Sequence, residues 1–129
     1  MTERMSDVLK SLAGEDYCYL TTTGRVTGRP HTIEIWFGAR GNSLYLLSGG
    51  GHESDWVKNL LKKPEVTVRI AKTTFSATAR LVADPEEEMA ARYMLAEKYN
   101  EWEEERTLSE WARTALVVGI DLNSILTSE

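Results

Sequence analysis

The chain has 129 residues, of which 42% are hydrophobic and 27% charged, as expected for one soluble globular domain covering residues 1–129. Its net charge of −5 argues against a general binder of nucleic acid or anionic membranes, which would show a basic face. A single cysteine excludes an internal disulfide, and no transmembrane-length run or secretory signal is visible, so we expect a cytoplasmic protein without a membrane span.

The first part of the chain shows one helix followed by strand patterns. Residues 5–13 place apolar side chains at helical spacing. Residues 17–23 are rich in aromatic and β-branched side chains, and residues 31–38 alternate apolar with other side chains, so both segments favour strands. Residues 39–42 suit a hairpin turn that leads into a third strand at residues 43–48.

The second part of the chain mixes helices with further strands. A short helix is expected after Ser54, and Pro64 ends it. A long helix is expected at residues 84–100, with Pro85 in its first turn, and a shorter helix at residues 108–113. The remaining predicted strands cover residues 66–70, 75–82 and 115–122.

Six short strands joined mostly by short turns favour antiparallel pairing. Closing such strands into a small barrel leaves few exposed edges, whereas a doubly wound parallel sheet needs longer crossover connections. The sequence therefore predicts a mainly β fold with inserted helices, in the form of a six-stranded antiparallel barrel.

Three consecutive glycines, Gly49, Gly50 and Gly51, separate Ser48 from the predicted helix after Ser54. Without Cβ atoms, the backbone N–H groups of such a loop can approach an anion or a flat ring closely. A loop that only needs positive φ angles would use the same residues, so both interpretations stay open. The glycine spacing matches neither the dinucleotide-binding fingerprint nor the P-loop.

The turn TTTGRVTGRPH, at residues 21–31, concentrates hydroxyl and basic side chains. Thr23, Arg25 and Arg29 lie within it, and arginine suits the recognition of phosphate and carboxylate groups. A solvated hairpin turn would have a similar composition. His31 begins the next strand, where it is suited to contact an anion, to act as an acid, or simply to lie at the surface.

Other chemistry is poorly supported by the residue pattern. His52, Glu53 and Asp55 are the nearest to a metal-ligand set, but acidic residues beside Ser54 suit a helix start, so we predict no metal site. No nucleophile–base arrangement is recognisable, and no catalytic residue is predicted. The four tryptophans provide either core area or stacking surfaces for ring ligands.

Two segments taken together resemble the flavin/deazaflavin oxidoreductases, and most of all their deazaflavin-dependent nitroreductase branch. The first is TTGRVTGRP at residues 22–30, and the second joins the small-residue loop at 48–51 to WVKNLLKKPEVTV at 56–68. The resemblance extends over residues 17–122. It implies a split β-barrel, the fold shared with pyridoxamine-phosphate-oxidase-like proteins.

The resemblance implies a homodimer that binds coenzyme F420, or alternatively FMN, near the subunit interface. It implies an oxidoreductase that passes hydride between the cofactor and a small electrophile such as a quinone, nitro compound or activated alkene; a non-catalytic cofactor carrier is the competing hypothesis. Tyr93 and Tyr99 are candidates for the acceptor side. Together with the turn and glycine-loop reasoning, it predicts these cofactor-binding residues: Thr23, Arg25, Arg29, His31, Ser48, Gly49, Gly50, Gly51, Trp56 and Asn59.

Overall fold

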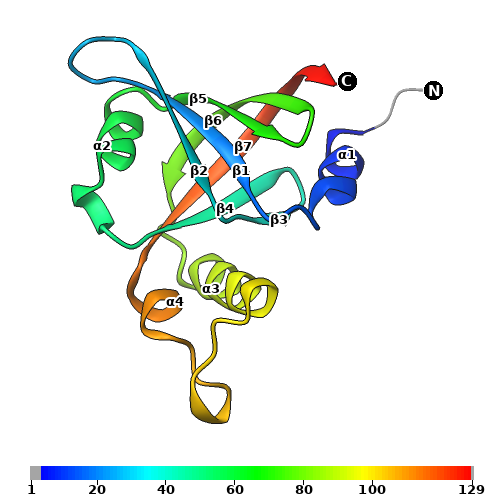
Figure 1. The fold of residues 1–129 in the computed structure, drawn as a ribbon, viewed down its shortest axis with the longest axis vertical. Helices are drawn as coiled ribbons and strands as arrows, with labels where there is room; N and C mark the ends of the chain where they lie inside the picture. The colour runs from blue at the N-terminus through cyan, green and yellow to red at the C-terminus, as the bar shows by residue number, and fades with distance from the viewer. Residues whose placement is uncertain (1–3, 129) are drawn as a thin grey trace.

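A computed structural model of the protein describes residues 4–128. Its centre is a seven-stranded antiparallel sheet with the strand order β2-β1-β5-β6-β7-β4-β3 (Figure 1). The strands are β1 (Cys18–Thr23), β2 (Pro30–Ile35), β3 (Gly38–Arg40), β4 (Ser43–Ser48), β5 (Glu65–Ile70), β6 (Thr73–Leu81) and β7 (Leu116–Ser128). The predicted fold class, mainly β with inserted helices, is confirmed.

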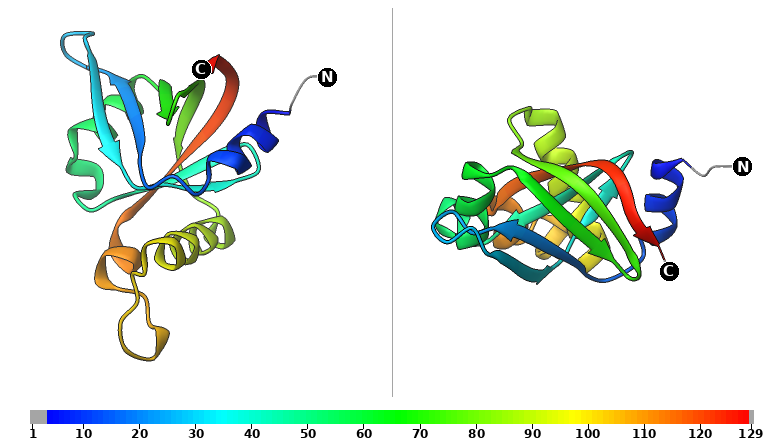
Figure 2. Two further views of the ribbon diagram at one scale, coloured as in Figure 1. Left: turned by 45° about the vertical axis from the view of Figure 1, so that its right-hand side comes forward. Right: turned by 90° about the horizontal axis from the view of Figure 1, so that it is seen from above.

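Helices lie around three sides of this curved sheet (Figures 1 and 2). They are α1 (Met5–Leu12), η1 (Gly51–Glu53), α2 (Asp55–Lys62), α3 (Pro85–Tyr99), η2 (Glu104–Arg106) and α4 (Glu110–Thr114). In Figure 1, α1 lies beside β3, α2 lies at the opposite side, and α3 and α4 lie below the sheet. None of the helices within residues 4–128 is long and apolar enough to cross a membrane.

Within residues 4–128 the structure has one strand more than the sequence predicts, because the segment expected as a single strand at residues 31–38 bends. Its first part, β2, pairs with β1, whereas its last part, β3, pairs with β4 at the other end of the sheet. The bend falls at Trp36 and Phe37. There, Phe37 N donates to Tyr99 Oη (3.0 Å) and Phe37 O accepts from Lys98 Nζ (3.0 Å), so α3 satisfies backbone groups at the bend.

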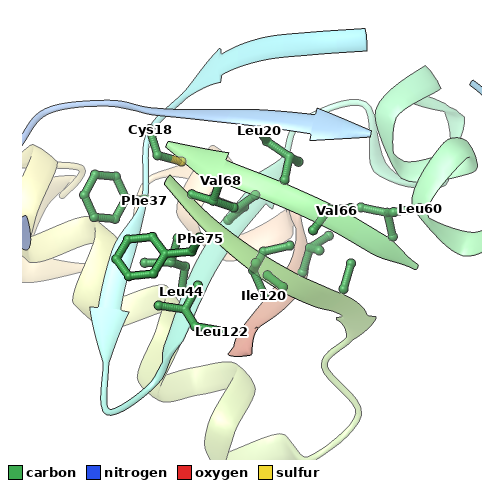
Figure 3. Packing of buried hydrophobic residues seen from close by; sticks show 14 of the residues in the cluster. Cys18, Leu20, Phe37, Leu44, Leu60, Val66, Val68, Phe75, Ile120 and Leu122 are labelled. Atoms are coloured by element: carbon green, nitrogen blue, oxygen red, sulfur yellow. The ribbon is translucent and has the colours of Figure 1, made fainter. Parts of the chain in front are cut away.

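The core lies between the strands and is built from side chains at every second strand position (Figure 3). Phe37 and Phe75 are the largest fully buried side chains, and Leu20 and Ile120 are also fully buried. Cys18 belongs to the same cluster, and burial raises the pKa of its thiol to about 12. Such a thiol is a small apolar packing group and not a nucleophile.

Arg80 on β6 connects α3 to the sheet. Its guanidinium binds Glu87 in the first turn of α3 (2.6 Å) and Asp121 on β7 (2.7 Å). Gly119 makes room for it, because a Cβ there would lie 3.2 Å from Arg80 Cζ. Hydrogen bonds from Arg80, and then from Tyr45, lower the pKa of Glu87 from 4.5 to about 2.

This ion pair predicts a pH dependence of folding stability. Because the pKa of Glu87 in the folded state lies below its value of 4.5 in the unfolded chain, its stabilisation is complete above pH 4.5 and is lost as the pH falls towards 2. Urea unfolding from neutral to acidic pH should show this loss. Glu87→Gln should be less stable at neutral pH and should lose less stability on acidification, whereas Glu86→Gln, at an exposed neighbour, should follow the original protein.

Candidate functional site

A cavity of about 590 Å³ lies between the β1–β2 turn, the start of β2 and the start of α2. The ribbon views place this turn and α2 side by side (Figures 1 and 2). The volume is within the usual range for small-molecule sites. Four of the ten predicted binding residues line it, namely Arg25, His31, Trp56 and Asn59. We call it the polar cavity.

The β1–β2 turn holds its shape through backbone hydrogen bonds. Gly24 N donates to Arg29 O (2.7 Å), and Gly28 N donates to Gly24 O (2.9 Å). A Cβ on Gly24 would lie 2.8 Å from His31 Nε2, so only glycine lets the imidazole pack against the backbone here. The turn therefore brings His31 to the wall of the polar cavity, next to Arg25.

Asn59 on α2 ties the helix to the turn. It is only 4% exposed, and its Oδ1 accepts from both Arg25 N (3.1 Å) and Arg25 Nη1 (2.8 Å). Its Nδ2 donates to Thr22 Oγ1 (3.3 Å) at the end of β1. One buried amide therefore fixes α2, the turn and the strand relative to one another.

Arg25 already has an acidic partner in the polar cavity. Its Nη2 lies 3.2 Å from Asp55 Oδ1, and the two side chains are 31% and 85% exposed. Asp55 therefore offsets part of the positive charge that a bound anion would meet. The exposed Arg29 lies in the same turn but does not line the cavity.

The start of α2 adds backbone donors at the edge of the polar cavity. The helix begins at Asp55, and the side chain of its N-cap, Ser54, makes no capping hydrogen bond. The hydroxyl of Ser54 instead lies 2.9 Å from Ser48 Oγ. Because the first N–H groups of a helix carry a partial positive charge, this end of α2 favours an anion.

The glycine loop at residues 48–51 lies outside the residues that line the polar cavity. Ser48 is buried and donates to Gly51 O (3.0 Å), so the loop closes on itself. Gly51 has a φ of +60°, and a Cβ on Gly50 would lie 2.5 Å from Ser54 Oγ. The structure therefore accounts for both glycines by loop geometry. Gly49 differs, because its Cβ position faces Trp111 at 3.7 Å.

This arrangement predicts that Gly50→Val destabilises the protein. The new side chain would displace Ser54 and disturb the start of α2, at a cost of about 1–3 kcal/mol as for other overpacked sites. Gly49→Ala is the matched control, since its Cβ would make an ordinary contact with Trp111. Thermal or urea unfolding of both variants measures the difference in stability. Equal stabilities would show that the Ser54 side chain can move aside at little cost in free energy.

A second cavity, of about 390 Å³, lies farther along β2, and we call it the aromatic cavity. Ile33 on β2 lines the polar cavity, and Ile35 on the same face of the strand lines the aromatic one. Its remaining lining residues are Tyr17, Glu34, Trp36, Leu47, Glu101 and Trp111.

Two of these lining residues, Trp36 and Trp111, form perpendicular walls. Their ring centroids are 5.5 Å apart with an interplanar angle of 87°. Tyr99, a predicted acceptor-side residue, stacks on Trp36 at 4.2 Å, whereas Tyr93 instead contacts Trp102. The sequence did not predict this cavity. The presence of four tryptophans in 129 residues was the one sequence feature that hinted at an aromatic site, but their spacing does not show which of them lie together in the fold.

The two cavities suit different kinds of ligand group. The polar cavity offers a guanidinium, an imidazole and helix N–H groups, which suit phosphate or carboxylate oxygens. The aromatic cavity offers indole faces and edges, which suit a flat ring. Within residues 4–128, no three His, Cys, Asp or Glu side chains converge as metal ligands do.

Solved structures of other proteins share this fold. A putative pyridoxamine 5'-phosphate oxidase from Listeria innocua superimposes with a TM-score of 0.73 at 19% identity, over 96% of this chain and 97% of that chain. An F420-H2 dependent reductase gives 0.65 at 20% identity, over 82% and 94%. A protein described as a domain-swapped dimer gives 0.66 at 20% identity, over 82% and 80%. These similarities establish the split-barrel fold.

The sequence itself matches one described family over most of its length. Residues 1–117 match the family described as F420H(2)-dependent quinone reductase. The match includes the β1–β2 turn, the glycine loop, α2 and both tryptophans of the aromatic cavity.

Proposed function

Because the chain belongs to the F420H(2)-dependent quinone reductase family, we propose that it passes hydride from reduced coenzyme F420 to a quinone or a similar small electrophile. Its class as an F420-dependent oxidoreductase follows from the family, and so does the choice of F420 over FMN. Nitro compounds and activated alkenes are the other acceptor classes that we propose.

The residues of the polar cavity fit an anionic cofactor of this kind. Arg25, His31 and the first N–H groups of α2 would hold phosphate and carboxylate oxygens, with the exposed Arg29 adding positive charge in the same turn. Thr23 and Asn59 would contact the polyhydroxylated chain. Trp56 and the loop at residues 48–51 would lie near the ring. The observation that carries this assignment is that the Arg25 guanidinium, the His31 imidazole and the first turn of α2 line one cavity.

When bound, the reduced deazaflavin supplies a hydride, and one proton from solvent completes the reduction of a quinone to its hydroquinone. The protein's contribution is to bind and orient the two reactants. Asn59 holds the start of α2 in place, and the indole walls of the aromatic cavity keep water away from a bound ring.

A binding titration on one preparation tests the proposal. Binding is measured through cofactor fluorescence. Reduced or oxidised F420 should bind at least about tenfold more tightly than FMN. Turnover is then measured by oxidation of the reduced cofactor with quinone, nitro and alkene acceptors. Failure of F420 to bind, or of every acceptor to oxidise it, would contradict the proposed reaction.

We further propose that the protein is a cytoplasmic homodimer with the cofactor near the subunit interface. The domain-swapped dimer among the similar structures supports this assembly. Exposed apolar side chains such as Leu61, Tyr93 and Leu126 provide surface for a contact between copies. Light scattering after size-exclusion chromatography should therefore give twice the mass of the 14.5 kDa chain.

A further inference from the structure

The aromatic cavity has a fixed shape, because the Trp36 indole that forms one of its walls is held by contacts on its other face. Tyr99 lies parallel to Trp36, with an interplanar angle of 1°, and its hydroxyl also donates to Asp16 O (2.8 Å). Lys98 holds the carbonyl of Phe37, the residue after Trp36. The end of α3 therefore sets the orientation of the Trp36 indole.

The aromatic cavity is positioned next to the proposed cofactor site. Leu47 in its wall directly precedes Ser48 of the glycine loop, and Ile35 lies two residues after Ile33 of the polar cavity. Gly49 lacks a side chain where it faces Trp111. A planar molecule in the aromatic cavity, against the exposed indole surfaces, would therefore lie close to a ring held at the glycine loop.

The charged side chains that line the aromatic cavity are all acidic. Glu34 and Glu101 are its charged lining residues, and among the described residues no Lys, Arg or His lines it. Glu34 Oε1 already accepts from Tyr19 Oη (2.7 Å). Glu101 is fixed through its backbone, which bonds Ala96 O (2.9 Å) and Ser109 N (3.1 Å), while its carboxylate has no hydrogen bond or ion pair within residues 4–128.

We infer that the aromatic cavity is the acceptor site and that it selects planar acceptors without negative charge, with Glu101 as the residue that disfavours anionic ones. This inference rests on the proposed function. Contact with the exposed surfaces of the Trp36 and Trp111 indoles, which line the cavity, provides affinity for a flat ring. A carboxylate at the rim, with no cation beside it, repels an acceptor that carries a sulfonate or carboxylate group.

Quinone binding to the cofactor-free protein tests the inference without turnover. Tryptophan fluorescence is titrated with naphthoquinone and with naphthoquinone sulfonate, which differ by one negative charge. The neutral quinone should bind about three- to tenfold more tightly, as expected for one partly screened like-charge contact. Cys18 is fully buried, so arylation of the thiol should not interfere.

Two matched pairs of variants assign the effect to residues. Glu101→Gln should bring the affinities for the two quinones closer together, whereas Glu104→Gln, at an exposed position in η2, should behave like the original protein. Trp36→Leu should abolish quinone binding while F420 binding persists. Trp102→Leu, outside the cavity, should leave quinone binding unchanged.

Several results would overturn the inference. These are equal affinities for the two quinones, identical behaviour of the two glutamate variants, or quinone binding that survives Trp36→Leu. Quinone affinity that falls as protein concentration rises would assign the cavity to a contact between copies. Failure of the proposed function is distinguishable, because F420 binding is read from the cofactor's own fluorescence: quinone binding without F420 binding contradicts only the cofactor assignment.

Discussion

Asn59→Leu is expected to lower both the stability of the protein and its affinity for F420. The replacement has a similar size but leaves Arg25 N and the Thr22 hydroxyl without the partners that the amide provides. Leaving such buried polar groups unsatisfied costs about 1–3 kcal/mol each, so we expect a total loss of about 2–6 kcal/mol. Because α2 and the turn form the cofactor cavity together, affinity should fall by about tenfold or more.

Urea unfolding and a fluorescence titration with F420 measure the two effects of Asn59→Leu separately. Asn123→Leu is the matched control, since Asn123 also donates its amide to a threonine hydroxyl, that of Thr78, but at an exposed position. Asn123→Leu should lower the free energy of unfolding by less than about 1 kcal/mol, because water can satisfy the polar groups that lose their partner. Equal losses in the two variants would show that burial of Asn59 is not what makes it important.

Arg25→Ala is expected to weaken F420 binding by about 10- to 100-fold, which corresponds to the loss of one or two charge-assisted hydrogen bonds. The effect is enlarged by Asp55, whose carboxylate loses its partner and remains at the cavity. Asp55→Asn should have the opposite effect and strengthen binding by a few-fold. Both effects should shrink as salt concentration increases.

A titration of each variant at low and high salt measures these shifts. Arg69→Ala provides the control for net charge, because Arg69 lies over Tyr19 and does not line the polar cavity. Its affinity for F420 should match that of the original protein. If Arg25→Ala and Asp55→Asn changed affinity in the same direction, Arg25 would act by holding the turn and not by attracting an anion.

The sequence predicts the positions of the strands well but not the bend between β2 and β3. Alternating side chains continue from Ile33 to Phe37, so residue pattern alone indicates one strand. The pairing partner changes within that segment, and the hydrogen bonds that support the bend come from Tyr99 and Lys98, far away in the chain. Local periodicity carries no information about such distant partners.

Only part of the candidate site could be predicted, again because local sequence patterns do not reveal contacts between distant residues. The resemblance pointed to the turn and to α2, and the structure brings Arg25, His31, Trp56 and Asn59 to one cavity. The sequence suggested a helix start for Asp55 but not its ion pair with Arg25. The meeting of Trp36 and Trp111 depends on how α4 packs, which no spacing in the sequence encodes.

The position of β7 has a consequence for synthesis. This strand lies between β6 and β4, and until it forms, β4 pairs only with the three-residue β3. A hairpin that short is not stable alone, so the apolar side chains of β4 stay uncovered while the ribosome adds the intervening residues over roughly several seconds. A nascent chain of this protein is therefore prone to aggregate during that interval. Weakening substitutions in β7 should reduce the yield of folded enzyme more than its cofactor affinity.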